Sequence, residues 1–473
     1  MFINRADELA VLERAYRSER AELFVLYGRR RVGKTELLQV FCADKPHLFF
    51  VATLASDAEQ LASFSHAIWG YTHAEVPAGF TFPSWEAAFA ALADLPGRPV
   101  VVLDEFTYLI SGHRAIPSIL QKAWDGVLRH TRVMLILCGS YIGMMEREVL
   151  GYQAALYGRR TGSALLEPLR LCGAAAFFPA YDPEEQIAAW AVLGGMPYYL
   201  QAFTDHLSVL ENVRAQILDT RGLLYNEPHL LVSEELREPR NYFSILHCIA
   251  HGHTRLGVIA QHAGVGTPST VSAYLDVLQR MRLVERRVPA TERQPDKSKK
   301  GMYRLCDPFL RFWFRYVHPH RGSLEIGLGD AVLQQRVAPT FAQYVGFAFE
   351  DAAREHVADL AVQGRLPFLP ERIGSWWDRH AEIDVVAVSD ADEAILVGEC
   401  KWWDGPVGLN VLKDLQRRAR LLTSQGRWTR TWYALWSKEG FTSELQAVAK
   451  DEGVFLVKAD DLLEDGDRPR ANC

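Results

Sequence analysis

The chain has 473 residues, of which 49% are hydrophobic and 23% are charged, and its formal net charge is -6. A chain of this length does not fold around one hydrophobic core, so two to four domains are expected. The composition is typical of a soluble globular protein, and the negative net charge excludes nucleic-acid binding driven by the charge of the whole chain. Any such binding must come from local basic patches.

The sequence predicts a cytoplasmic protein without membrane contact. No apolar run approaches the length of a membrane span, and the polar start Met1–Glu8 lacks the features of a signal peptide. The seven cysteines are scattered without a C-x-x-C pair, which indicates reduced core residues.

The first strongly patterned stretch predicts a phosphate-binding loop. A helix is expected from Phe2–Leu9, with Asn4 as its N-cap, and the apolar run 23–27 predicts a buried strand. The following residues fit G-x-x-x-x-G-K-[ST] and lead into a helix, as a P-loop requires. This loop would hold ATP, with Lys34 reaching the outer phosphates and Thr35 binding Mg²⁺. Its residues are Gly28, Arg29, Arg30, Arg31, Val32, Gly33, Lys34 and Thr35.

Two later strands carry polar residues at their carboxyl ends, where ligands bind in open α/β sheets. The apolar run 100–103 ends in Asp104 and Glu105. We expect Asp104 to orient the magnesium shell and Glu105 to polarise the attacking water. The run 133–139 ends in Ser140, which stands where a γ-phosphate sensor belongs, although the residues alone also fit a simple Gly-Ser turn.

A basic loop and a glycine-rich bend follow. Arg159 is the first candidate for an arginine finger, and the alternative is a solvated basic turn. A finger supplied in trans would require a homo-oligomer. The bend L-G-G-M-P-Y-Y-L at 193–200 follows a helical stretch.

Taken in order, these motifs resemble those of the archaeal-type ATPases in the STAND branch of AAA-like proteins. They are the box at 2–9, G-R-R-R-V-G-K-T, V-L-D-E-F, L-C-G-S, L-Y-G-R-R-T-G and G-G-M-P-Y-Y-L. The resemblance covers roughly the first half of the chain. It implies an ATP-driven switch with a helical lid after the α/β core.

The middle of the chain predicts three helices and a hairpin, which is the winged helix-turn-helix plan. Helices are expected at 242–251 and 256–263, and a third begins at Thr267 as N-cap with Pro268 at the first helical position. Ser269, Thr270 and Ser272 would lie at the start of the recognition helix. A local basic patch supports DNA contact, although such domains also serve as internal clamps. The patch comprises Arg280, Arg282, Arg286, Arg287, Arg293, Lys297, Lys299 and Lys300.

The aromatic segment 307–317 fits core packing of a connecting helix better than a nucleic-acid platform. It resembles the D-P-F-x-R-F-W joint before the C-terminal domain of such ATPases.

The C-terminal part predicts a hairpin with facing acids. If the strands 382–388 and 394–402 close about Ala391 and Asp392, Asp384 lies opposite Glu399, and Lys401 shares the face of Glu399. Opposed carboxylates repel, and a divalent metal relieves the repulsion. Asp384 and Glu399 would hold Mg²⁺, Glu350 could complete the shell, and Lys401 would help to activate water. The alternative, a solvated edge hairpin, fits poorly with its apolar residues.

The pattern D-x(n)-E-x-K on adjacent strands resembles the PD-(D/E)XK nuclease fold, with Ile383-Asp384 in place of Pro-Asp. Relatives of this fold also bind without cutting. The predicted fold is therefore an α/β multidomain protein with five parts. These are an AAA-like P-loop NTPase core (1–170), a helical lid (171–238), a winged helix-turn-helix (239–306), a helical linker (307–344) and a restriction-endonuclease-like α/β domain (345–473).

The predicted function is an ATP-hydrolysing switch coupled to a DNA-binding, Mg²⁺-dependent DNA-cleaving domain. The alternative is an ATP-gated DNA-binding regulator or signalling NTPase whose last domain does not cut.

Overall fold

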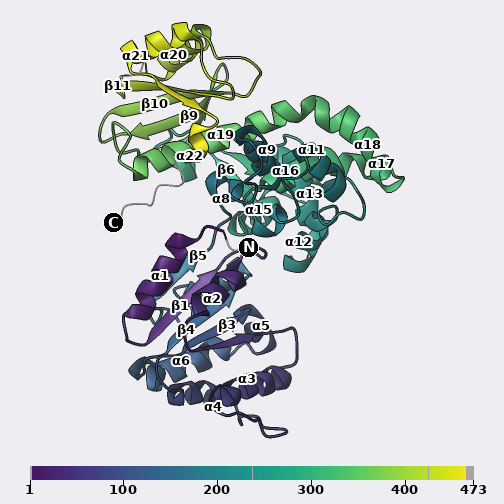
Figure 1. Cartoon of the computed structure of the whole chain (residues 1–473), viewed down its shortest axis with the longest axis vertical. Helices are drawn as coiled ribbons and strands as arrows, with labels where there is room; N and C mark the ends of the chain where they lie inside the picture. The colour runs from purple at the N-terminus through teal and green to yellow at the C-terminus, as the bar shows by residue number, and fades with distance from the viewer. Residues whose placement is uncertain (1–2, 237, 424–425, 465–473) are drawn as a thin grey trace. The chain divides into compact units, whose positions relative to one another are not determined.

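The computed structural model describes residues 3–236, 238–423 and 426–464, and it divides into two compact units, Met1–Pro168 and Leu169–Cys473 (Figure 1). Phe2 of the predicted N-terminal box lies outside the described residues. In the described part of the chain, no helix combines the length and the apolar character needed to span a membrane. The finer boundaries predicted at 238, 306 and 344 stay predictions.

The first unit is built on a parallel sheet with the strand order β2-β3-β4-β1-β5 (Figure 1). The central strands are buried along their whole length, as expected for a parallel sheet covered on both faces. The strands are β1 (Glu22–Tyr27), β2 (His47–Val51), β3 (Val100–Asp104), β4 (Met134–Gly139) and β5 (Gly162–Leu165). The helices are α1 (Ala6–Arg17), α2 (Lys34–Cys42), α3 (Asp57–Thr72), α4 (Trp85–Ala91), α5 (Phe106–Gly112), α6 (Ile116–Gly126) and α7 (Ile142–Met145).

The second unit begins with short helices around the G-G-M-P bend. Gly195 cannot be replaced without movement, because an added Cβ would lie 1.7 Å from the carbonyl oxygen of Leu169. The amide of Leu169 donates to the Gly195 carbonyl at 2.7 Å, so the bend joins the start of this unit to the end of α9. The helices here are α8 (Leu171–Ala175), α9 (Pro183–Leu193), α10 (Pro197–Leu200), α11 (Val209–Asn212) and α12 (Glu227–Glu235).

Three helices and a two-stranded hairpin follow at the predicted positions. Thr267 caps α15 by accepting the amide hydrogen of Thr270, with Pro268 at the first helical position, and both predictions are confirmed. The elements are α13 (Pro239–Ala250), α14 (Leu256–Ala263), α15 (Pro268–Arg280) and the antiparallel hairpin of β6 (Val284–Arg287) and β7 (Met302–Leu305).

The aromatic segment after the hairpin forms core, as the sequence predicts. Asp307 caps α16 (Pro308–Phe312), and the rings of Phe309, Phe312 and Trp313 are fully buried. The indole of Trp313 donates to the carbonyl of Tyr225 at 2.7 Å. The short helices α17 (Arg321–Glu325) and α18 (Gly329–Val332) lead to the long helix α19 (Ala338–Val362).

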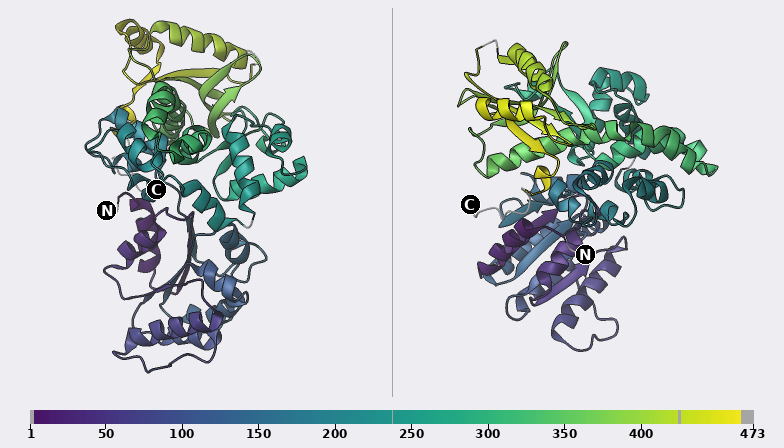
Figure 2. Two further views of the ribbon diagram at one scale, coloured as in Figure 1. Left: turned by 90° about the vertical axis from the view of Figure 1, so that its right-hand side faces the viewer. Right: turned by 45° about the horizontal axis from the view of Figure 1, so that its top comes forward.

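The chain ends in a second sheet with the order β12-β11-β10-β9-β8. Strands β8, β9 and β10 are antiparallel neighbours, whereas β10, β11 and β12 run parallel through crossover helices. Figures 1 and 2 show α19 on one side of this sheet and α20 and α21 on the other. The elements are β8 (Arg372–Trp377), β9 (Glu382–Ser389), β10 (Ala394–Lys401), α20 (Leu409–Thr423), β11 (Arg430–Ser437), α21 (Ser443–Glu452), β12 (Phe455–Lys458) and α22 (Asp461–Glu464).

The register of the β9–β10 hairpin matches the prediction. Ala394 pairs with Ser389 and Gly398 with Val385, so the next step along the ladder places Glu399 opposite Asp384. This register confirms the predicted closure of the hairpin about Ala391 and Asp392.

Candidate functional site

The loop between β1 and α2 is shaped by its two glycines. An added Cβ at Gly28 would lie 2.4 Å from the carbonyl oxygen of Leu166, so no side chain fits there. Gly33 has a φ of 93°, in the left-handed region that favours glycine. The loop therefore turns tightly at the carboxyl edge of the sheet and enters α2 at Lys34.

Lys34 and Thr35 occupy the start of α2. The Lys34 side chain is buried, and its Nζ donates to the carbonyl oxygens of Gly28 and Arg29, each at 2.9 Å. The hydroxyl of Thr35 donates to Oδ2 of Asp104 at 2.7 Å. The fold thus brings together the loop and the end of β3, which are 69 residues apart along the chain.

Glu105 follows Asp104 directly and faces Ser140 at the end of β4. The Ser140 hydroxyl donates to Oε1 of Glu105 at 2.5 Å. The other carboxylate oxygen, Oε2, is buried and has no hydrogen-bond partner among the described residues. A buried carboxylate oxygen without a donor is suited to accept a hydrogen bond from water.

The entry to α1 differs from the prediction. The helix begins at Ala6 with Arg5 as its N-cap, and Asn4 has a φ of 58°, so the prediction of Asn4 as N-cap is wrong. The Asn4 side chain instead accepts the amide hydrogen of Arg5. This backbone directs the buried Arg5 side chain to the loop, where Nη2 donates to the Val32 carbonyl at 3.1 Å. Arg5 was not singled out from the sequence, although it is the arginine of the F-x-x-R box.

These residues fit a nucleoside triphosphate with Mg²⁺. The glycine loop leaves room for close approach of phosphates, and Lys34 stands ready to exchange its carbonyl partners for phosphate oxygens. Thr35 and Asp104 supply the hard oxygen atoms that Mg²⁺ prefers. Among the remaining loop residues, Arg30 contacts the hydroxyl of Tyr108.

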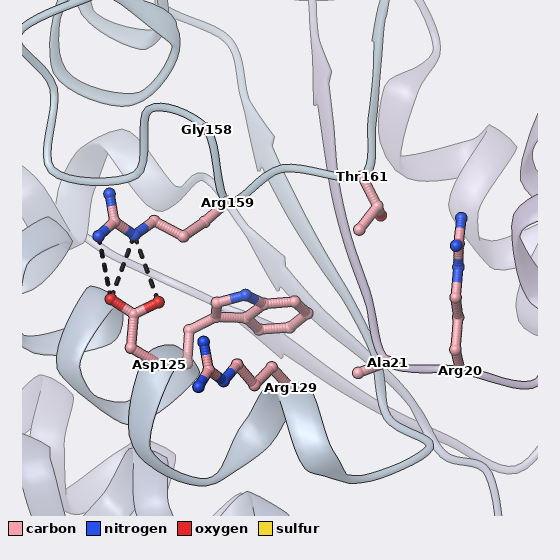
Figure 3. A pocket seen from close by; sticks show the side chains of 8 residues that line it. Arg20, Ala21, Asp125, Arg129, Gly158, Arg159 and Thr161 are labelled. Carbon is pink, nitrogen blue, oxygen red and sulfur yellow. Dashed lines mark hydrogen bonds and ion pairs between the residues drawn. The ribbon is translucent and has the colours of Figure 1, made fainter.

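Arg159 lies at the opposite edge of the sheet. It forms a bidentate pair with Asp125 at 3.0–3.3 Å and lines a cavity of about 500 Å³ (Figure 3). Ala21 and Thr161, which also line this cavity, precede β1 and β5, whereas the P-loop follows β1. Six residues of strand separate the two edges by about 20 Å. Arg159 therefore does not reach the nucleotide site of its own chain, and a finger role would have to serve a second copy.

In the second unit, Asp384, Glu399 and Lys401 meet on the β9–β10 hairpin. Lys401 Nζ lies 2.6 Å from Oε1 of Glu399, which places both side chains on one face. Oδ2 of Asp384 accepts the amide hydrogen of Cys400 at 2.9 Å. The sequence predicted this arrangement from the register and the alternation of the strands.

Two arginines at this site were missed by sequence reasoning. Arg418 on α20 lies 2.9 Å from Oε2 of Glu399. Arg354 on α19 donates through Nη1 to the carbonyl oxygen of Asp384 at 2.5 Å. Both come from helices that flank the hairpin in the chain, and neither belongs to a motif that would single it out.

Glu350 lies close enough to Asp384 for the charge of Asp384, after burial, to raise the pKa of Glu350, but it lies on the other side of the sheet from Glu399. It lies on α19, 3.6 Å from Arg354, whereas Glu399 faces α20 on the other side of the sheet. Among the described residues, no three His, Cys, Asp or Glu side chains gather closely enough to hold a metal ion. Glu350 as a third metal ligand therefore stays a prediction that this conformation does not display.

The electrostatics of this region reflect buried acids near one another. Burial, followed by the charge of Glu399, raises the pKa of Asp384. Burial, followed by the charge of Asp384, raises the pKa of Glu350. Raised carboxyl pKa values occur where like charges share a site, and such sites are frequently functional.

The two halves of the chain match known families. Residues 2–203 match a family described as an ATPase domain predominantly from Archaea, and residues 313–418 match one described as Archaea bacterial proteins of unknown function. The uncharacterized protein MJECL04 of Methanocaldococcus jannaschii is 33% identical over 428 residues, which cover 89% of this chain and 92% of that protein.

Among solved structures, the chain is similar to the Walker-type ATPase PABY2304 of Pyrococcus abyssi. The TM-score is 0.50 and the identity 22%, over 66% of this chain and 96% of the other. This likeness shows a shared fold, and it agrees with the P-loop, the strand order and the separate C-terminal sheet described above. The chain belongs to the family that it shares with MJECL04, and it contains an archaeal-type ATPase domain followed by a C-terminal domain of a family of unknown function.

Proposed function

We propose that this ATPase is a switch whose C-terminal domain binds Mg²⁺ and cleaves DNA. The observation that carries the proposal is the hairpin register, which ends at Gly398 and Val385 and directs Asp384 and Glu399 toward each other, with Lys401 at 2.6 Å from Glu399. Two facing carboxylates and a lysine on adjacent strands are a donor set for a divalent metal and for a metal-activated water.

The order of elements supports the nuclease-like assignment. Helix α19 precedes the three antiparallel strands β8, β9 and β10, and α20 then crosses over to the parallel strand β11. This order is consistent with the PD-(D/E)XK resemblance of the sequence motifs. The facing acids lie on the two strands where that resemblance places them.

In the ATPase half, the contacts of five predicted residues support the roles proposed for them, namely Lys34, Thr35, Asp104, Glu105 and Ser140. Bound ATP with Mg²⁺ would supply the transferable phosphoryl group and its charge neutralisation. Lys34 would bind phosphate oxygens, and Thr35 with Asp104 would hold the metal. Glu105 would orient and deprotonate water through its free Oε2, while Ser140 fixes the other oxygen of that carboxylate.

DNA contact is proposed for α13–α15 and the β6–β7 hairpin, in the manner of a winged helix. Ser269 and Thr270 are exposed at the start of α15, as a recognition helix requires. Six basic residues of the predicted patch are also exposed, namely Arg280, Arg282, Arg293, Lys297, Lys299 and Lys300. The exposed part of the predicted basic patch lacks Arg286 and Arg287, which are partly buried and contact carbonyl or carboxylate groups of the same unit.

A second function, ATP-gated DNA binding without cleavage, is favoured by one observation. Arg418 lies 2.9 Å from Oε2 of Glu399, the oxygen that Lys401 leaves open, and Glu350 lies on the other side of the sheet from Glu399. A site closed by its own cations is what a domain that binds without cutting would show. In either function we expect a cytoplasmic protein that can form homo-oligomers, because the cysteines in the described residues are free thiols and Arg159 could serve only a second copy.

The test is cleavage of linear and single-stranded DNA by the full chain with Mg²⁺ or Mn²⁺. The proposal expects metal-dependent cleavage that is lost in Glu399→Gln and in Lys401→Ala, with ATP hydrolysis retained in both. Cleavage that survives both substitutions would come from another site or a contaminant. No cleavage, with ATP hydrolysis and DNA binding intact, would favour the non-cutting switch.

A further inference from the structure

One carboxylate in the second unit holds four arginines. Asp351 on α19 accepts Arg287 Nη2 at 2.8 Å, Arg311 Nη1 at 2.9 Å and Arg354 Nη2 at 2.6 Å. Arg304 also contacts it. Asp351 thereby joins both strands of the β6–β7 hairpin, the helix α16 and its own helix α19.

Asp351 supplies the negative charge that all four arginines of this network share. Two further acids contact the network: Glu285 lies 2.5 Å from Arg287, and Glu350 lies 3.6 Å from Arg354. The side chain of Asp351 is 13% exposed. Burial alone would raise its pKa, but the surrounding guanidinium groups outweigh burial and hold the pKa well below its ordinary value. The carboxylate is therefore ionised at neutral pH, and its removal would leave several buried cations without a counter-charge.

Arg354 connects this network to the facing acids. Its Nη2 donates to Asp351, while its Nη1 donates to the carbonyl oxygen of Asp384 and lies 3.6 Å from Glu350. The guanidinium is planar and rigid, so it cannot keep both contacts when either partner moves. A displacement of the hairpin arginines would therefore be transmitted through Asp351 and Arg354 to the backbone of Asp384.

We propose that Arg354 is a positioning residue that sets Asp384 for metal binding, and that the β6–β7 hairpin sets Arg354 through Asp351. The inference rests on the proposed metal site. It gives the hairpin a second task beside contact with DNA, namely control of the acidic site in the same unit. DNA engagement that moves the hairpin would change the metal affinity of that site.

The experiment is a titration of the full chain with Mn²⁺ in the absence of nucleotide. Binding is measured by calorimetry or by the electron paramagnetic resonance signal of free Mn²⁺. Asp384→Asn shows which part of the measured Mn²⁺ binding belongs to the acidic site, because that part should be lost in this variant. Arg354→Lys keeps the positive charge but cannot donate to Asp351 and to the Asp384 carbonyl at the same time. It is expected to weaken Mn²⁺ binding about tenfold. Arg287→Gln, at a residue that contacts Asp351 and Glu285 but has no contact with Asp384 or Glu399 among those described above, is expected to do the same. The double variant should bind Mn²⁺ no more weakly than either single variant.

Arg286→Gln is the matched control, because Arg286 neighbours Arg287 but bonds to the carbonyls of Pro295 and Ser298. Its Mn²⁺ affinity should equal that of the unchanged chain. Thermal unfolding and ATP hydrolysis, measured for every variant, separate loss of positioning from loss of fold. If Arg287→Gln does not fold, Arg354→Lys carries the test.

The outcomes separate the inference from the function on which it rests. A Mn²⁺ site that depends on Asp384 but is unchanged in Arg354→Lys overturns the inference and leaves the metal site standing. Additive losses in Arg287→Gln and Arg354→Lys would also overturn the proposed route through Asp351. Absence of any Mn²⁺ site that depends on Asp384 removes the metal site and the inference together.

Discussion

The nucleotide site and the acidic site of the C-terminal sheet differ in how their charges are held. In the first, Lys34 donates to two backbone carbonyls, and Glu105 keeps one oxygen without a hydrogen-bond partner among the described residues. In the second, Glu399 is occupied by Lys401 and Arg418. The predicted nucleotide site is thus arranged before its ligand arrives, whereas a metal proposed for the acidic site would have to displace the protein's own cations. The difference predicts a constitutive ATPase and a metal site that needs activation.

The largest expected effect is at Lys34. Lys34→Ala removes the cation that meets the phosphates, and ATP hydrolysis should fall at least about 100-fold together with ATP binding. Calorimetric titration with ATP measures the binding. The exposed Lys122→Ala on α6 is the control and should bind ATP normally. Normal ATP binding by Lys34→Ala would show that the loop is not the nucleotide site.

Glu105 tests whether the free carboxylate oxygen is the base. Glu105→Gln should retain ATP binding and lose hydrolysis by roughly 10²- to 10⁴-fold, the usual contribution of a general base. Ser140→Ala, which removes only the hydrogen bond to Oε1, should cost much less. Single-turnover kinetics separate the chemical step from binding. Equal losses in the two variants would contradict the distinct roles assigned to them.

A substitution at Arg418 tests whether the ion pair between Arg418 and Glu399 hinders metal binding. If Arg418 competes with the metal for Glu399, Arg418→Gln should tighten Mn²⁺ binding by roughly fivefold, or about 1 kcal/mol. The nearby surface variant Arg417→Gln serves as the control, since Arg417 is 71% exposed and pairs with Asp414. Weaker Mn²⁺ binding in Arg418→Gln would mean that this arginine supports the site instead of closing it.

The smallest expected effect is a pH dependence of Mn²⁺ binding at the acidic site. Burial raises the pKa of Asp384, so this carboxylate binds protons at a higher pH than an exposed aspartate. Since a metal requires the ionised form, Mn²⁺ affinity should be weak in mild acid and increase as pH rises through the raised pKa. Titrations between pH 5 and 8 measure it. An affinity that is constant over this range would contradict the raised pKa.

Local motifs predicted that the P-loop, the Asp104–Glu105 pair and Ser140 come together, because each of them follows a strand. Parallel topology then brings them to one edge. The Asp384–Glu399 register was also predictable, because a short hairpin closes symmetrically. The capping of α1 was missed, because Arg5 turns inward to bond the loop, and this contact overrides the capping preference of Asn4.

Long-range contacts account for the rest. Arg418 and Arg354 reach the acids from helices whose packing on the sheet no local pattern specifies. Arg159 was placed in a basic loop correctly, but the sequence did not reveal that this loop precedes β5 at the edge far from the P-loop. The sequence also did not reveal that Arg287 pairs with Asp351 in an ion network, because that contact joins segments far apart in the chain.

The central claim is that the ATPase controls a DNA-cleaving site in the same chain. The most direct measurement compares DNA cleavage by the unchanged chain and by Glu105→Gln, each with and without ATP, in Mg²⁺. The account predicts that ATP changes the rate of DNA cleavage by the unchanged chain. Glu105→Gln should bind ATP without hydrolysing it, so with ATP present it should keep the cleavage rate of the ATP-bound state. Cleavage rates that ignore ATP in both proteins would contradict the claim.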